Sequence, residues 1–235
     1  MIYSRRLLLR YLFHDGLWDD VLRQADELLE WDRARGGSQI EHWVLGDTAL
    51  VLANRGQASR AASMIEEALP GAREIADPQT VLPLLAMGAL AACAVSDMKT
   101  ADALLSEYTA SGHRVFDEDV AWLAIAAVTV GGAERVEHLL DGWEPLSTCG
   151  RAARAHGLAL AAEATGRSDE AAELFAEAVE GWRTWGSVPL RAYALLGLGA
   201  CSGGEAALAE GEAIFARLGA TPIQPLTEPR RQQQV

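Results

Sequence analysis

The stretch TGRSDEAAELFAEAVEGWRTW, residues 165–185, decides the fold that the sequence predicts. Gly166 is a turn residue, and Ala171, Phe175 and Ala178 lie five, nine and twelve positions after it. These offsets place two small residues and one large residue on a single helical face. Because small side chains let a neighbouring helix approach closely, the stretch predicts the second half of a helix–turn–helix unit.

The same register recurs along the chain. The expected turn residues are spaced 40, 40, 35, 35 and 35 residues apart, and they are Gly16, Gly56, Ser96, Gly131, Gly166 and Cys201. Seven residues before each turn stand Leu9, Ala49, Ala89, Ala124, Ala159 and Ala194. Five residues after each turn stand Val21, Ala61, Ala101, Val136, Ala171 and Ala206. Nine residues after each turn stand Ala25, Ile65, Leu105, Leu140, Phe175 and Glu210, of which only the last is not apolar. A fixed period of this length is typical of helical repeat arrays.

These columns predict an all-α chain, an α-solenoid of about six helix–turn–helix units. The repeat domain covers residues 1–219, with units near 3–37, 39–75, 77–112, 115–144, 147–186 and 187–219. Residues 220–235 are rich in proline and glutamine and are expected to form a disordered tail.

The composition narrows the classes of function. A net charge of −13 repels nucleic-acid phosphates and anionic membranes, so we expect neither as a direct partner. The three cysteines, Cys93, Cys149 and Cys201, are far apart, which argues against a disulfide framework and favours a reducing cytoplasm. No segment has the apolar length of a signal-peptide core or of a membrane span.

The small and large positions resemble those of a tetratricopeptide repeat. The match rests on Leu158, Ala159, Gly166, Ala171, Phe175 and Ala178, and the resemblance covers most of the chain. It implies a right-handed superhelix in which the first helix of each unit lines a concave, peptide-binding surface. Projecting the inward positions of the family onto this chain yields candidate partner-binding residues Trp43, Asn54, Glu118, His156, Glu163 and Arg191, together with Leu90 and Ile125.

A narrower resemblance lies near the C-terminal end. Residues 182–201, WRTWGSVPLRAYALLGLGAC, and residues 210–222, EGEAIFARLGATP, look like the closing repeat of large bacterial ATP-binding regulators. These include LuxR-type and MalT-like transcription regulators and some cyclase-associated ATPases. Neither an ATPase module nor a DNA-binding domain is apparent in the sequence. The resemblance therefore implies a fragment, a truncated reading frame or a free-standing relative.

Residues that carry chemistry do not form a convincing constellation. Residues 197–202, GLGACS, resemble a dinucleotide fingerprint only superficially, and small-residue packing between helices explains them better. Glu134, Glu137 and His138 share a short helix, which is more typical of a solvated face than of a metal site. We therefore predict no catalytic residue, no metal ligand and no cofactor. Trp182 and Trp185 either pack between units or form an exposed interface for a partner.

Three hypotheses for function follow. The first is a non-enzymatic interaction or sensor module of a bacterial signalling or transcription regulator of the LuxR-type or MalT-like class, with a protein or peptide as ligand. The second is a free-standing adaptor that scaffolds partner proteins or forms a homodimer through its first or last unit. The third is an all-α enzyme, in which Glu163 or His156 would be required for turnover.

Overall fold

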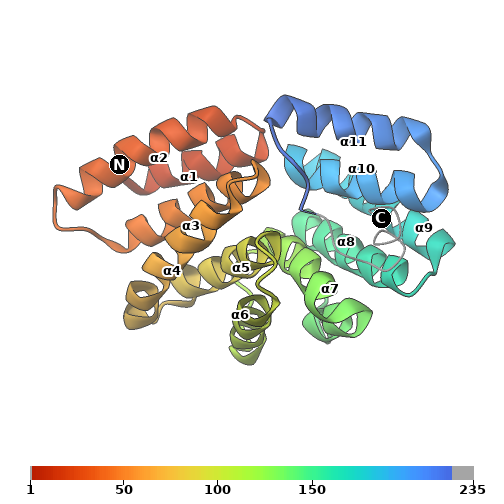
Figure 1. Cartoon of the computed structure of the whole chain (residues 1–235), viewed down its shortest axis with the longest axis horizontal. Helices are drawn as coiled ribbons and strands as arrows, with labels where there is room; N and C mark the ends of the chain where they lie inside the picture. Colours follow the sequence, from red (N-terminus) through yellow and green to blue (C-terminus); the bar gives the residue numbers. More distant parts are fainter. Residues whose placement is uncertain (1, 224–235) are drawn as a thin grey trace. The chain divides into compact units, whose positions relative to one another are not determined.

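The computed structural model describes residues 2–223, and within this range the chain is helical and contains no β-strand (Figure 1). The helices are α1 (Ile2–His14), α2 (Trp18–Arg33), α3 (Gln39–Asn54), α4 (Ala58–Ile75), α5 (Pro78–Ala94), α6 (Met98–Ala110), α7 (Asp117–Leu140), α8 (Thr148–Ala164), α9 (Ser168–Trp185), α10 (Val188–Ser202) and α11 (Glu205–Leu218). The prediction of an all-α fold is therefore confirmed.

The long helix α7 is two helices in sequence. Gly131 and Gly132 leave the helical conformation in its interior, and Gly132 has a φ of +65° that a side chain would disfavour. The break separates residues 117–130 from residues 133–140. Counted this way, helices alternate with short turns through the described residues, as the sequence register predicts.

The described residues form two compact units. The first contains residues 2–115 with 218–221, and the second contains residues 116–217 with 222–223. In the first unit, α3 packs against both α1 and α5, while α2, α4 and α6 each pack on the helix that precedes them. In the second unit, α7, α8, α9 and α10 pack in sequence, and α8 also contacts α10. In each unit, therefore, one helix contacts both the helix that follows it and the one after that: α3 contacts α4 and α5, and α8 contacts α9 and α10.

The turns inside the hairpins share one geometry. The turn residues Gly16, Gly56, Ser96 and Gly166 all have a positive φ, between 63° and 78°. At each of them the chain closes a hydrogen bond across six residues, which is the bond that ends a helix in a Schellman motif. The N–H groups of Leu17, Gln57, Asp97 and Arg167 donate to the carbonyls of Leu12, Leu52, Ala92 and Ala162, each at 2.9 Å.

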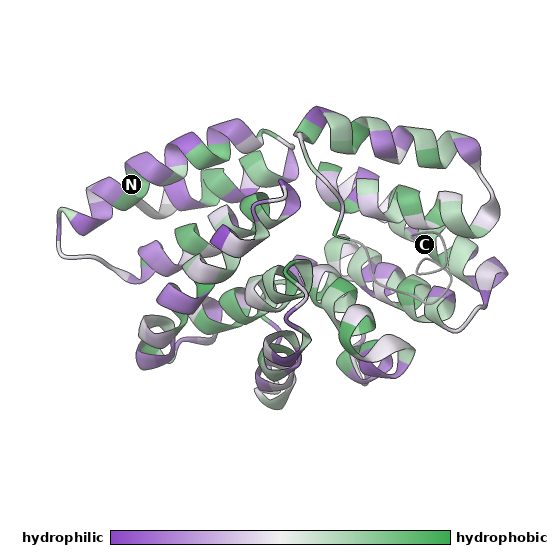
Figure 2. Ribbon diagram, in the orientation of Figure 1, coloured by the Kyte–Doolittle hydropathy of each residue, from purple (hydrophilic) through white to green (hydrophobic). Residues whose placement is uncertain are grey.

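The predicted columns form the buried surface between helices. The residues seven positions before the six expected turns are at most 1% exposed. Five positions after the first five turns, every residue is 0% exposed, and nine positions after them none exceeds 4%. In Figure 2 the ribbons of α1 and α2 alternate purple and green, whereas α5 is mainly green and white. That agrees with the burial of α5 on nearly all its faces.

The prediction for the last hairpin is wrong in detail. Its turn has positive φ at Gly203 rather than at Cys201, and Ala206 and Glu210 are exposed. The buried residues of α11 follow the predicted column by one position, which rotates the buried face by about 100° and moves the apolar stripe to other positions. Those positions are Gly211, Ile214, Phe215 and Leu218. The fourth turn likewise has its positive φ at Gly132, one residue after the expected Gly131.

The glycines of residues 197–202 serve helix packing. They lie within α10, where a Cβ on Gly197 would come within 2.3 Å of the Phe175 ring. A Cβ on Gly199 would lie 2.8 Å from the backbone nitrogen of Leu208 in α11. The absence of a side chain lets α10 lie against both neighbours, as the packing interpretation predicted.

Two hydrogen bonds donated by backbone N–H groups hold the C-terminal end of the described chain. The N–H of Thr221 donates to the carbonyl of Asn54 at 2.8 Å, and the N–H of Ile223 donates to the Tyr193 hydroxyl at 2.8 Å. Ile223 is 8% exposed. Residues 224–235, most of the predicted disordered tail, lie outside the described residues. Among residues 2–223, no helix combines the length and apolar character needed to cross a bilayer.

Candidate functional site

A small cavity lies between α1, α3 and α5 of the first unit, and we call it the α1–α3–α5 cleft. Its volume of about 10 Å³ provides room for one water molecule. The lining residues are Arg6, Arg10, His42, Trp43, Gly46, Asp47, Thr80, Pro83, Leu84 and Met87. Apolar and charged side chains therefore meet at one place on the first helices of three successive hairpins.

A buried ion pair joins α1 to α3 at this cleft. Arg10 Nη1 donates to Asp47 Oδ1 at 2.9 Å, and the two side chains are 11% and 4% exposed. Gly46, the neighbour of Asp47, leaves room for α5, because a Cβ on Gly46 would lie 3.3 Å from a Leu84 methyl group. The carboxylate is thus held in a closely packed place where the arginine compensates its charge.

Trp43 and Arg6 form the more open side of the cleft. The Arg6 guanidinium lies over the Trp43 ring, 5.1 Å from the ring centroid, in a cation–π arrangement. The indole Nε1–H donates to the carbonyl of Gln79 at 2.9 Å, which fixes the ring against the start of α5. Trp43 is partly exposed whereas Arg6 is only 6% exposed, so the ring presents its outer part to solvent.

Within residues 2–223, three buried polar side-chain atoms of the lining residues on α3 and α5 have no hydrogen-bond partner. They are Asp47 Oδ2, Thr80 Oγ1 and His42 Nδ1. Thr80 is 0% exposed and Asp47 is 3% exposed. Buried polar atoms are destabilising unless they are hydrogen-bonded, so a cleft of this size with three such atoms is suited to a bound water molecule or to a polar group of a ligand.

The local charge of the cleft differs from that of the whole chain. Two arginines and one aspartate line it, whereas the chain carries a net charge of −13. Both arginines are buried, and they pack beside the apolar side chains of Pro83, Leu84 and Met87.

Among the residues predicted from the sequence, Trp43 lies at the cleft and Asn54 does not. The Asn54 side chain is 0% exposed, and its amide donates to the carbonyl of Leu50 at 2.8 Å. Asn54 is therefore a structural residue, and its assignment to a partner-binding face is wrong. Leu90 and Ile125 are also buried, at 0% and 1% exposure.

The remaining predicted residues belong to the second unit, and the structure does not gather them into one pocket. Glu118, Glu163 and Arg191 are partly exposed. Arg191 forms an ion pair with Glu210, and Glu118 accepts a weak hydrogen bond from the Cys149 thiol at 3.8 Å. These three side chains are accessible, and their role in binding stays a prediction.

His156 and Trp182 are core residues, so the assignment of His156 to a binding face is wrong, and of the two alternatives for Trp182 the burial agrees with packing and not with an exposed interface. They are 1% and 0% exposed, and Trp182 Nε1–H donates to His156 Nδ1 at 3.2 Å. This bond requires His156 Nδ1 to be unprotonated, and burial lowers the pKa of His156 from 6.5 to about 4. Trp185 is partly exposed and contacts the edge of Trp182, with ring centroids 5.8 Å apart.

The cleft contains residues that the sequence reasoning missed, namely Arg6, Arg10, His42, Asp47 and Thr80. One signal was present. Arg6 and Arg10 lie four residues apart, on the same helical face as Leu9 and Phe13, and Asp47 interrupts the mainly apolar run of residues 43–53. A buried charge in an apolar run needs a partner, which is a reason to look for one on a neighbouring helix.

The sequence matches no known protein-family model and no curated protein.

Proposed function

We propose that this chain is a non-catalytic helical-repeat module of tetratricopeptide-like units that binds a protein or peptide at the α1–α3–α5 cleft. On the C-terminal resemblance described above, it acts in the cytoplasm as the interaction or sensor part of a bacterial regulator of the LuxR-type or MalT-like class. The observation that carries the proposal is the cleft itself, which combines unsatisfied polar atoms with apolar side chains and a partly exposed tryptophan.

The place of the cleft supports a binding role. In the tetratricopeptide arrangement the first helices of successive units line the ligand surface, and α1, α3 and α5 are the first helices of three successive hairpins. Because α3 contacts both α1 and α5, the three helices present neighbouring side chains along one wall. An extended or helical peptide crosses such a wall and contacts several helices at once.

The chemistry of the cleft suits recognition of a peptide with mixed character. Trp43 provides a rigid aromatic surface, which is the kind of side chain that most often dominates binding energy. Asp47 Oδ2 and Thr80 Oγ1 can take hydrogen bonds from a polar group that enters the cavity. A change in the arrangement of α1, α3 and α5 on binding would then be the signal that a sensor transmits.

A second candidate function is a free-standing adaptor that forms a homodimer. The exposed apolar side chains of α1 favour it, and they include Leu7, Leu8 and Tyr11.

The proposal is tested by selecting peptides and mapping where they bind. Random peptides displayed on phage are selected against the immobilised full chain, and the affinity of the recovered peptides is measured by fluorescence anisotropy. Trp43→Ala is expected to raise the Kd by about fivefold or more, because truncating an aromatic hot-spot residue removes more than about 1 kcal/mol. Circular dichroism of each variant confirms that the helices are intact.

Trp31→Ala is the matched control. Trp31 is also a partly exposed tryptophan, and the Arg35 guanidinium carbon lies 4.0 Å from its ring centroid, but Trp31 belongs to α2. The proposal requires Trp31→Ala to bind the selected peptides as the unmodified chain does. Equal losses for the two variants, or no loss for Trp43→Ala, would show that the cleft is not the binding site.

A further inference from the structure

The outer face of α1 carries an exposed apolar surface. Leu7, Leu8 and Tyr11 are 51%, 43% and 69% exposed, and Ser4 beside them is also exposed. We call these four residues the α1 outer face. Among the described residues, three of the eight large apolar side chains that are exposed belong to it. Large aromatic and aliphatic side chains gathered on one exposed face are typical of an interaction surface.

This face is separate from the cleft. In a helix each residue turns by about 100°, so the α1 outer face points away from Arg6 and Arg10. Those two arginines, with Leu9 and Phe13, form the buried side of α1 that packs on α2 and α3. A contact at the α1 outer face therefore rests on the second candidate function, the homodimer, and is independent of peptide binding at the cleft.

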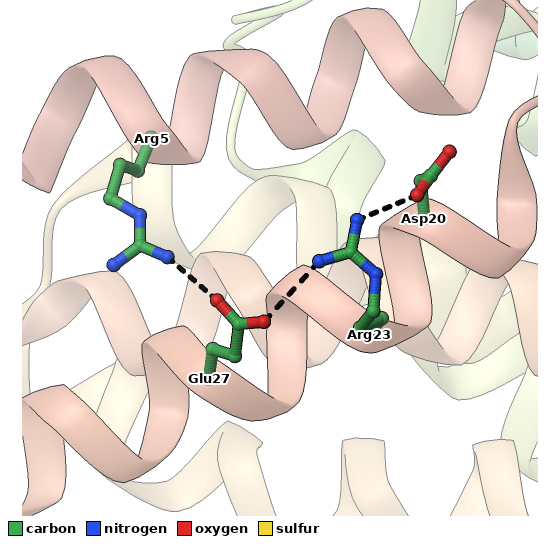
Figure 3. A network of polar contacts seen from close by, with 4 residues as sticks. All are labelled: Arg5, Asp20, Arg23 and Glu27. Atoms are coloured by element: carbon green, nitrogen blue, oxygen red, sulfur yellow. Dashed lines mark hydrogen bonds and ion pairs between the residues drawn. The ribbon is translucent and has the colours of Figure 1, made fainter.

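The charges around the α1 outer face differ at its two ends. Arg5 borders the face at the N-terminal end of α1, and Asp15 follows the C-terminal end and is exposed. Arg5 reaches sideways to Glu27 of α2 at 3.1 Å (Figure 3). Glu27 also accepts from Arg23, which pairs with Asp20 at 2.7 Å. The side chains of Arg5 and Glu27 stay 39% and 53% exposed, so this network leaves both within reach of a further partner.

The electrostatics of the whole chain indicate which surface two copies can share. Each copy carries a net charge of −13, which opposes association through acidic surfaces. Helix α1, with the sequence IYSRRLLLRYLFH, contains no acidic residue. Two copies that meet through α1 therefore bring together helices that carry no acidic side chain.

We propose that the α1 outer face pairs with the same face of a second copy of this chain in an antiparallel arrangement. A two-fold axis is self-complementary, because a contact from residue i to residue j is repeated from j to i. Placing Leu8 of one copy against Tyr11 of the other centres the axis on the apolar surface. The same alignment sets Arg5 of each copy beside Asp15 of the other, so that opposite charges close both ends of the interface.

The expected dimer is weak. Helix α1 has 13 residues and is therefore about 20 Å long, so two such helices bury an area at the low end of specific interfaces, below about 1,200 Å² in total. Sedimentation equilibrium of the full chain over a wide concentration range is the appropriate measurement. The weight-average mass rises from the 25.2 kDa of one chain toward twice that value as the concentration increases.

Substitutions on the α1 outer face distinguish a specific dimer interface from non-specific association. Tyr11→Asp, at a side chain that is 69% exposed, raises the dimer Kd by about tenfold or more, and circular dichroism of the variant confirms that the helices are intact. Leu146→Asp is the matched control, because Leu146 is 92% exposed and lies in the loop before α8. Its dimer Kd equals that of the unmodified chain.

A charge swap tests the antiparallel arrangement. Arg5→Glu and Asp15→Arg each weaken the dimer, because each places like charges at both ends of the interface. The double variant R5E/D15R restores the dimer, because the two positions then carry opposite charges again with their signs exchanged. A mass of one chain at all concentrations overturns the proposal. An effect of Leu146→Asp equal to that of Tyr11→Asp overturns it as well, and a double variant weaker than both single variants rejects the antiparallel alignment.

Discussion

The ion pair between Arg10 and Asp47 provides the sharpest test of how the first unit is held together. The variant Asp47→Leu removes the carboxylate that pairs with the Arg10 guanidinium at 2.9 Å, where the Arg10 side chain is only 11% exposed. Breaking a buried pair from one side destabilises a protein by about 3–5 kcal/mol, because an uncompensated charge stays in the interior. We therefore expect Asp47→Leu to lower the free energy of unfolding of the first unit by that amount, and Arg10→Met to lower it similarly.

The double variant R10M/D47L is expected to behave differently from the sum of the single variants. With both charges gone, α1 and α3 pack through two apolar side chains, and such replacements are often neutral or stabilising by about 1–4 kcal/mol. The coupling between the two sites is thus large, as expected for side chains in direct contact at 2.9 Å.

Hydrogen exchange followed by mass spectrometry is the suitable assay, because the chain contains two compact units that need not unfold together. Protection is read from peptides of α1 and α3, and peptides of α8 and α9 in the second unit serve as an internal control. If the free energy of unfolding of the first unit fell by less than about 1 kcal/mol in the single variants, the reasoning would be refuted, since exposed ion pairs contribute no more than that. A decrease in the double variant equal to the sum of the decreases in the two single variants would refute it too.

Three further predictions concern buried groups of other kinds. Burial lowers the pKa of His156 to about 4, so between pH 6.5 and pH 4 the unfolded chain binds the proton more readily. The stability that neutral His156 contributes is therefore complete above about pH 6.5 and falls as the pH drops toward 4, by at most about 1.4 kcal/mol per pH unit. In urea unfolding, the free energy of unfolding of His156→Gln should lack this dependence on pH. Gly197→Ala is expected to lower the thermal midpoint through overpacking of about 1–3 kcal/mol against the Phe175 ring, with partial recovery in G197A/F175L, and an unchanged midpoint would contradict the packing interpretation. Burial raises the pKa of the Cys93 thiol to about 12, so a thiol reagent at neutral pH should label the partly exposed Cys201 first and Cys93 only after unfolding, as peptide mass spectrometry would show.

The local architecture was accessible from the sequence because it depends on short-range periodicity. Residues such as Ala49, Ala124 and Ala171 recur at fixed distances from a turn, and each is at most 1% exposed. The turn residues Gly56 and Gly166 adopt the positive φ that ends a helix. The same reasoning failed at Glu210, because the last turn lies later than the period predicts and the buried position is the next residue, Gly211. One residue turns a helical face by about 100°, which is enough to expose Glu210.

The polar residues show why the candidate site was not accessible in the same way. Asn54 and His156 occupy positions that the resemblance assigns to a binding face, yet both are buried. The side-chain amide of Asn54 donates to a carbonyl four residues earlier on its own helix, whereas His156 accepts its hydrogen bond from Trp182 on the next helix. The sequence pattern predicts that a residue lies on a helix and near a turn, but it does not predict whether a neighbouring helix covers that residue.

The sequence by itself determined that the chain is helical, where its hairpin turns lie within a residue or two, and which columns of small and apolar residues are buried between helices. These follow from helical periodicity and from glycine at positions of positive φ, which are properties of neighbouring residues. Only the tertiary structure decided that Arg10 meets Asp47 across 37 residues of chain, that Thr80 joins them at one cleft, and that the outer face of α1 stays exposed. The reason is physical, because burial and charge pairing depend on how separate helices pack against one another, and that packing is a property of the folded chain.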